Sequence, residues 1–229
     1  EPALEHLDRA LELEGPNRAD ALRLKARVLI ELNRLREAER VMDGLVSEQP
    51  GSVPLRMERL KLYVSAGRYQ AAVSQADALL ADPALEQGSP DRLQARYVKG
   101  LSLVSLKRYQ EALEILSGIT RPETRAAGLE EVHPSALYYR AWSAYRLRRF
   151  EEALDQARSF LRDYDGHPLA GDAAFLAGWC SYSLGRYGEA AELFARVARD
   201  ESRGEEPGAL ADKAFFLQAK SEKNRGMSG

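Results

Sequence analysis

The chain has 229 residues, of which 33 are Lys or Arg and 35 are Asp or Glu, so 33 − 35 gives a formal net charge of −2. Apolar residues make up 45% and charged residues 30%, which excludes intrinsic disorder. Because the charge is balanced, the general attraction to polyphosphate is missing, and nucleic acid is not an expected partner. The single cysteine, Cys180, can form neither an internal disulfide nor a thiolate zinc cluster.

A short motif recurs five times, with an Arg, then a large apolar residue, then an Ala, as in Arg68, Tyr69 and Ala72. The successive Ala residues are separated by 34, 40, 41 and 37 residues. Apolar residues on both sides of each motif recur at i, i+3, i+4 and i+7, which predicts two amphipathic helices joined by a tight turn. Each repeat is therefore expected to be a helical hairpin. The five Ala residues are Ala38, Ala72, Ala112, Ala153 and Ala190.

In chain order, the pattern predicts one orphan helix, five hairpins and a terminal helix, about twelve helices in a single domain over residues 1–229. No run alternates with period two for long enough to predict a strand. Loops are expected at 82–91, 120–134 and 200–208, which are rich in Gly, Pro and charge. The orphan half-repeat is expected at 2–16, the hairpins at 18–50, 52–83, 90–120, 133–165 and 168–200, and the terminal helix at 208–224.

Glycines fall at two kinds of position in these hairpins. Gly67 and Gly185 lie where a helix would end in a left-handed residue, which glycine adopts without a steric penalty. Gly100 and Gly178 lie twelve residues before the turn Ala, where Ala26 and Ala141 occupy the equivalent places and Leu60 is the exception. Small residues there predict a close crossing of the two helices of a hairpin.

These residues resemble the tetratricopeptide repeat family, whose pattern W-x2-L-G-x2-Y…A-x3-F…P spans 34 residues. Gly178 with Ala190 and Phe194, and Ala38 with Met42, match that pattern, and the resemblance covers nearly the whole chain. It implies an all-α fold, a right-handed α-solenoid of antiparallel hairpins that stack on one another. It also implies that the first helix of each hairpin lines a concave groove that binds a protein or peptide partner.

The groove residues can be counted back from each turn Ala, by fifteen, eleven and eight positions. In the last three hairpins and the terminal helix this stripe is aromatic and includes both tryptophans, which is typical of binding hot spots. The alternative is that the rings pack between neighbouring helices, as we expect for Tyr139 and Phe216, one position off the stripe. The expected groove residues are Tyr97, Leu101, Tyr138, Trp142, Tyr145, Phe175, Trp179, Tyr182 and Phe215.

The same count in the first two hairpins gives a cationic end of the groove, at Arg23, Arg27 and Lys61. These side chains could bind a carboxylate of a peptide, or they could be a solvated helix face. Some members of the family clamp a terminal carboxylate with Lys and Asn, and this chain lacks the Asn. The arginines of the five turns, Arg34 through Arg186, are expected to cap carbonyl groups at helix ends.

No catalytic constellation is present, so the sequence predicts a protein that is not an enzyme and needs no cofactor or metal. His133 and His167 each precede a proline, which suggests helix entry, and no third metal ligand has suitable spacing. Cys180, next to Trp179, is expected to be inert core. Phosphate-binding glycine loops and the nucleophile and zinc-protease motifs are absent from the sequence.

Three functions remain open: a protein-interaction scaffold, a carrier of an apolar or aromatic small molecule, and a structural spacer within a larger chain. The longest stretch without charge, 173–185, has 13 residues and cannot span a bilayer. The chain starts at Glu1 rather than Met, which suggests a fragment or processed chain. The segment 167–190 resembles repeats of bacterial cell-envelope lipoproteins and cell-division coordinators, which implies a bacterial periplasmic scaffold, with the cytoplasm as the alternative.

Overall fold

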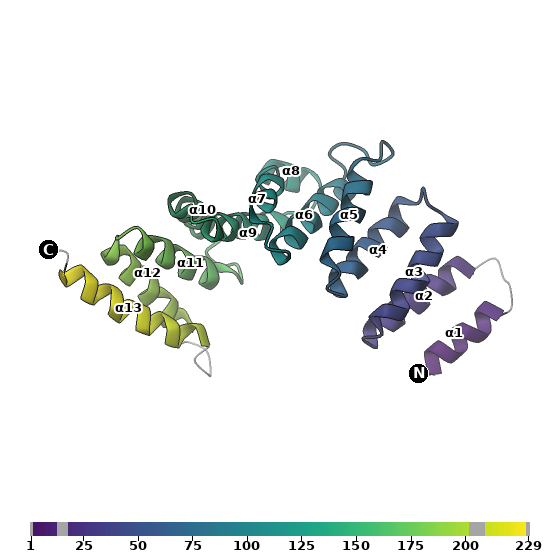
Figure 1. The fold of residues 1–229 in the computed structure, drawn as a ribbon, viewed down its shortest axis with the longest axis horizontal. Coiled ribbons are helices and arrows are strands. Elements are labelled where there is room, and N and C mark those ends of the chain that lie inside the picture. Colours follow the sequence, from purple (N-terminus) through teal and green to yellow (C-terminus); the bar gives the residue numbers. More distant parts are fainter. Residues whose placement is uncertain (1, 13–17, 202–208, 228–229) are drawn as a thin grey trace. The chain divides into compact units, whose positions relative to one another are not determined.

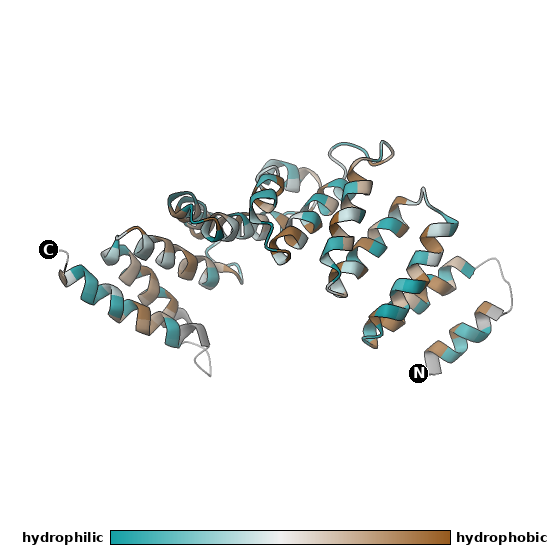
Figure 2. Ribbon diagram, viewed as in Figure 1, coloured by the Kyte–Doolittle hydropathy of each residue, from teal (hydrophilic) through white to brown (hydrophobic). Residues whose placement is uncertain are grey.

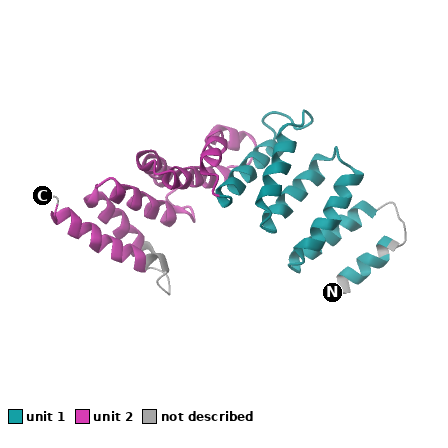
Figure 3. Ribbon diagram, in the orientation of Figure 1, with its two compact units in different colours: residues 1–106 teal, residues 107–229 magenta. Residues whose placement is uncertain are grey.

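The computed structural model describes residues 2–12, 18–201 and 209–227, and every regular element in these ranges is an α-helix (Figure 1). The chain divides into two compact units, Glu1–Leu106 and Lys107–Gly229 (Figure 3). The boundary falls in the turn of the third expected hairpin, so the two helices of that hairpin belong to different units. None of the described helices is both long enough and apolar enough to cross a membrane.

Each unit is built of antiparallel helices, most of which pack on their neighbours in the chain. Hydrophobic and hydrophilic residues recur along each helix, as amphipathic packing requires (Figure 2). Unit 1 contains α1 (Pro2–Glu12), α2 (Arg18–Glu31), α3 (Leu35–Glu48), α4 (Val53–Ser65), α5 (Tyr69–Leu80) and α6 (Pro90–Ser105). Unit 2 contains α7 (Tyr109–Ser117), α8 (Arg121–Ala126), α9 (Val132–Arg146), α10 (Phe150–Asp163), α11 (Ala170–Ser183), α12 (Tyr187–Glu201) and α13 (Ala209–Met227).

The described residues form thirteen helices, one more than expected, because the segment 120–134 is not only a loop. It contains α8, which starts where the Thr120 hydroxyl accepts a hydrogen bond from the Glu123 N–H at 3.4 Å. The helix ends at Ala126, and two residues later Gly128 has a left-handed φ of +67°, while the Leu129 N–H bonds the Thr124 carbonyl at 2.8 Å. The residues that suggested a loop are thus the start and stop signals of a short helix.

All five hairpin turns share one left-handed residue directly before the turn arginine. Gly67 and Gly185 have φ of +68° and +76°, as expected, and the other three turns place a residue with a side chain there. The next N–H then bonds a carbonyl five residues earlier, as from Arg68 to Tyr63 at 2.7 Å. This is the hydrogen bond that closes a Schellman motif. The other three left-handed residues are Asn33, Lys107 and Arg148, with φ of +57°, +61° and +62°.

The side chain of each turn arginine reaches a carboxylate, a contact that the sequence did not predict. Arg34 and Arg108 bind the glutamate three residues later, at 2.7 and 2.6 Å. Arg186 instead binds Glu151 of the preceding hairpin at 2.8 Å. It is the main-chain N–H of Arg34, Arg68, Arg149 and Arg186 that caps the helix. The remaining two side-chain pairs are Arg68 with Glu39 at 3.3 Å and Arg149 with Glu152 at 3.8 Å.

A small residue marks the crossing of α11 and α12, as expected. Gly178 is buried, and a Cβ built there would lie 2.7 Å from Cε1 of Phe194 on the facing helix. The turn alanines are buried as well, together with Ala26, Leu60, Gly100 and Ala141 at the equivalent positions. Close packing of α11 on α12 therefore depends on the absence of a side chain at Gly178.

Candidate functional site

The aromatic stripe of α11 forms one continuous face in unit 2. Phe175, Trp179 and Tyr182 are spaced by four and three residues, so they lie on the same side of the helix. Phe175 and Trp179 pack on the buried Phe194 of α12, with ring centroids 5.6 and 6.2 Å away. Because all three stripe residues are half-buried, each has one side in the core and another accessible.

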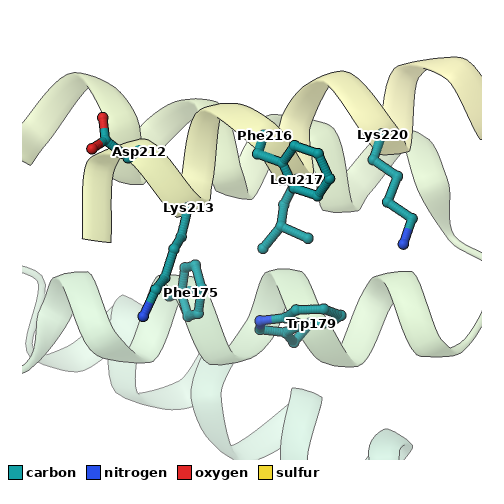
Figure 4. A pocket seen from close by; sticks show the side chains of 7 residues that line it. All are labelled: Phe175, Trp179, Asp212, Lys213, Phe216, Leu217 and Lys220. Atoms are coloured by element: carbon teal, nitrogen blue, oxygen red, sulfur yellow. The ribbon is translucent and has the colours of Figure 1, made fainter. Parts of the chain in front are cut away.

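The terminal helix α13 faces this stripe across a cavity of about 570 Å³, which we call the α11–α13 cleft (Figure 4). In Figure 4, Phe175 and Trp179 lie on the α11 side, and Leu217 extends from α13 toward them. Lysines lie at both ends of the α13 side of the cleft. The lining residues are Phe175, Trp179, Asp212, Lys213, Phe216, Leu217 and Lys220.

Phe216, rather than the expected Phe215, lines this cleft. Phe216 is 69% exposed, so its assignment to packing between repeats is wrong. Phe215 is 52% exposed and does not line the cleft. Phe215 is expected because the terminal helix can be aligned with α11 by matching Asp212 to Asp172. This alignment gives the position along the chain, but it does not give the rotation of α13 about its own axis relative to α11.

Tyr182 is fixed by residues of the terminal helix. Its hydroxyl accepts a hydrogen bond from Nδ2 of Asn224 at 2.9 Å. The ammonium of Lys220 lies 5.4 Å from the centroid of its ring. These contacts hold α13 against the end of the stripe, and they keep one positive charge beside the cleft.

On α9, the stripe residues Tyr138, Trp142 and Tyr145 are half-buried and pack against the core of unit 2. Burial raises the pKa of Tyr138, with a smaller contribution from the charge of Asp172. Trp142 contacts Tyr145 with ring centroids 5.7 Å apart, and the Arg146 guanidinium lies 5.7 Å from the Trp142 ring. These rings therefore combine core packing with an accessible side, and their role in binding stays a prediction.

Tyr97 and Leu101 lie on α6, which belongs to unit 1, whereas the other aromatic positions belong to unit 2. Both side chains are half-buried. A groove shared by all five hairpins accordingly stays a prediction.

The expected cationic residues do come together in unit 1, around a cavity of about 280 Å³ between α2 and α4. Arg23 is already paired with Glu58, whose carboxylate it reaches at 2.5 and 3.2 Å, and this hydrogen bond raises the pKa of Arg23. Arg27 and Lys61 are exposed, and no carboxylate of the described chain lies within 4 Å of them. Two cations are thus available at this α2–α4 cleft, rather than three.

The histidines and the cysteine have structural surroundings. His133 Nδ1 lies 2.7 Å from the Tyr164 hydroxyl, and His167 Nδ1 accepts a hydrogen bond from the Leu169 N–H at 3.1 Å. Cys180 is fully buried, and burial raises its pKa to about 12. Within the described ranges, no three His, Cys, Asp or Glu side chains are grouped so that they could hold a metal ion.

Comparison with protein-family models identifies the same kind of repeat that the hairpin turns indicate. Tetratricopeptide repeat models match residues 2–60, 57–123, 123–168 and 138–206, so the chain belongs to the tetratricopeptide repeat family. The family's fold is typical of protein–protein interaction modules. No curated protein sequence matches the chain.

Solved structures share the fold at low sequence identity. MamA from Desulfovibrio magneticus RS-1 is 20% identical, with a TM-score of 0.68 over 84% of this chain and 99% of the MamA chain. YrrB, described as a TPR protein with an unusual peptide-binding site, is 22% identical, with a TM-score of 0.65 over 93% of this chain and 99% of YrrB. The described part of this chain thus has the all-helical fold of tetratricopeptide solenoids.

Proposed function

We propose that this chain is a non-catalytic interaction scaffold whose α11–α13 cleft takes an apolar side chain from a segment of a partner protein. The observation that carries the proposal is the exposed Phe216 beside the half-buried Phe175 and Trp179, around one cavity. A fold shared with YrrB, whose description includes a peptide-binding site, supports the same class of function.

The charges around the cleft favour a partner segment with acidic residues beside its apolar anchor. Lys213 and Lys220 line the cleft together with one carboxylate, Asp212. The excess is one positive charge, which would steer an acidic segment toward the aromatic floor. The exposed Arg27 and Lys61 of the α2–α4 cleft favour carboxylates in the same way.

Two phenylalanines next to each other in the sequence make a matched test. Peptides that bind the chain are selected from a displayed random library, and their affinities are measured by fluorescence anisotropy. Phe216→Ala should weaken binding about 5- to 30-fold, because the buried part of one ring contributes about 1 to 2 kcal/mol. Phe215→Ala, on the same helix but outside the cleft, should leave the affinity unchanged. Equal affinities for the wild type and Phe216→Ala would contradict the proposal.

The size of the cavity supports a second candidate, an apolar small molecule. A volume of about 570 Å³ lies within the range of small-ligand pockets, roughly 300 to 1,000 Å³. Native mass spectrometry of the gently purified chain would find a retained compound in the wild type and less of it in Phe216→Ala. A wild-type spectrum with the mass of the bare chain alone would count against this candidate.

A further inference from the structure

The insertion between the third and fourth hairpins builds a polar pocket that neither cleft includes. The pocket, here called the α8 pocket, has a volume of about 270 Å³ and lies in unit 2, between α8 and the C-terminal end of α10. Each of its lining residues carries a polar group, and two of them are arginines. The lining residues are Arg121, Thr124, Arg125, Glu130 and Tyr164.

Both walls of the α8 pocket are held in place. Thr124 is fully buried and its hydroxyl bonds the Arg121 carbonyl at 3.0 Å, so the middle of α8 is anchored. On the other wall, the Tyr164 hydroxyl lies 2.7 Å from His133 Nδ1, and the Tyr164 ring packs on Phe160 with centroids 5.7 Å apart. Thr124 and Tyr164 are therefore held in place without a ligand, which lowers the entropic cost of forming this part of the pocket on binding.

The two arginines of the α8 pocket differ from those of the hairpin turns, because neither forms an ion pair in the described part of the chain. Arg121 lies over the Tyr164 ring, 5.5 Å from its centroid, and this contact leaves guanidinium N–H groups for a ligand. Arg125 is exposed, and Glu130 lines the pocket without pairing with either arginine. The α8 pocket thus holds two guanidinium charges against one carboxylate.

We propose that the α8 pocket binds a phosphate group, either as free phosphate or as the phosphorylated side chain of a partner protein. Two planar guanidinium groups at a small cavity match a ligand with several oxygens and about two negative charges. A single carboxylate would leave one arginine unpaired. The site is separate from the α11–α13 cleft, so it does not depend on the function proposed there.

Nuclear magnetic resonance of the imidazole groups tests the site in the intact chain. The chain has only three histidines, and His133 contacts the pocket through Tyr164, so its resonance reports on binding locally. The 15N-labelled chain is titrated with sodium phosphate at constant ionic strength, then with a short phosphoserine peptide and its unphosphorylated form. We expect a saturable shift of His133, with His6 of unit 1 as the unchanged reference.

The two ligands distinguish the sources of the phosphate. A shift with both ligands supports recognition of the phosphate group itself, and a shift with the phosphopeptide alone supports a partner's side chain. A shift of equal size with the unphosphorylated peptide, or no saturable shift with any ligand, would overturn the proposal.

Substitutions of exposed arginines test whether the shift of the His133 resonance arises from binding in the α8 pocket. Arg125→Ala should weaken binding about 10-fold or more, because a charge-assisted pair of hydrogen bonds is lost. Arg125→Lys keeps the charge but not the planar fork, so an intermediate affinity is expected. Arg199→Ala removes an exposed arginine of α12 and should have no effect. With folding checked by circular dichroism, wild-type affinity of Arg125→Ala would refute the site.

Discussion

Gly178 on α11 lies directly against the ring of Phe194 on α12, so that a Cβ at position 178 would come within 2.7 to 2.9 Å of three ring atoms. Phe194 is fully buried, which leaves its ring little room to move. This contact sets how closely the two helices of the last hairpin approach each other. The Phe194 ring also packs against Phe175 and Trp179, which line the α11–α13 cleft.

Gly178→Ala should lower the free energy of unfolding by about 1 to 3 kcal/mol, because one added methyl group overpacks the core. Urea unfolding followed by circular dichroism measures the change. Gly188→Ala on α12 is the control, since a Cβ there would meet only Arg225 Cδ at 3.6 Å, an ordinary contact. We expect that control to be neutral or stabilising by up to about 1 kcal/mol. Equal destabilisation by both substitutions would contradict the role of the Phe194 contact.

The left-handed turn residues predict two opposite stability changes. Gly185→Ala introduces a Cβ at φ of +76° and should destabilise the chain by about 1 kcal/mol. Arg148→Gly relieves the same strain at φ of +62° and should stabilise it by a comparable amount, reduced by the greater flexibility of glycine in the unfolded chain. Thermal unfolding of the two variants and the wild type shows whether each substitution raises or lowers the melting temperature. Two shifts in the same direction would be inconsistent with this explanation.

The hydrogen bonds of the Asp82 carboxylate predict that the folded chain loses stability in acid. The hydrogen bond from the Ala84 N–H, and then the bond from Arg56, lower the pKa of Asp82 below its usual value of 3.8. A carboxyl whose pKa is lowered by folding stabilises the protein above its unfolded pKa, and that contribution disappears as the pH falls through the folded pKa. Asp82→Asn should therefore be less stable than the wild type at pH 7, and the difference should shrink as the pH falls below 3.8.

The control for Asp82 is Asp91→Asn, which changes an exposed carboxylate of the same unit that has no ion pair among the described residues. Urea unfolding at pH 7 and at several values below pH 4 gives the comparison for both variants. A stability difference for Asp82→Asn that stays constant with pH would contradict the assigned contacts.

Cys180 offers a measure of how often unit 2 opens. Its side chain is fully buried and burial raises its pKa to about 12, so the folded thiol should not react with Ellman's reagent at pH 8. Reaction then requires opening of the core, and Gly178→Ala should accelerate it about tenfold for each 1.4 kcal/mol of lost stability. Labelling of the folded wild type at the rate of the urea-unfolded chain would show that the thiol is not protected.

The five hairpin turns show how much of this fold the sequence could predict. The repeated Arg and Ala identified every hairpin, because a turn between two helices depends on residues close together in the chain. Gly67 and Gly185 marked two left-handed positions, whereas Arg148 adopts the same conformation without a sequence signal. The start and stop signals of α8 are also present, at Thr120 and Gly128, but the Gly, Pro and charged residues of the segment favour a loop when the sequence is considered alone.

The candidate sites depended on contacts between residues far apart in the chain. Counting from the repeats placed Phe175 and Trp179 on the stripe, but only the packing of α13 showed that Phe216, rather than Phe215, lies beside them. Tyr164 faces Arg121 across the α8 pocket, 43 residues later, and no local spacing predicts such a pair.

The sequence alone thus determined every helix except α8, the hairpin turns and the family, since these follow from periodicity and from hydrogen bonds between near neighbours in the chain. The tertiary structure decided which side of a helix remains exposed and which carboxylate each arginine reaches. Those outcomes depend on the rotation and crossing of whole helices, which are set by the sum of many weak packing contacts. The cleft beside Phe216 and the pocket beside Tyr164 both belong to this second group.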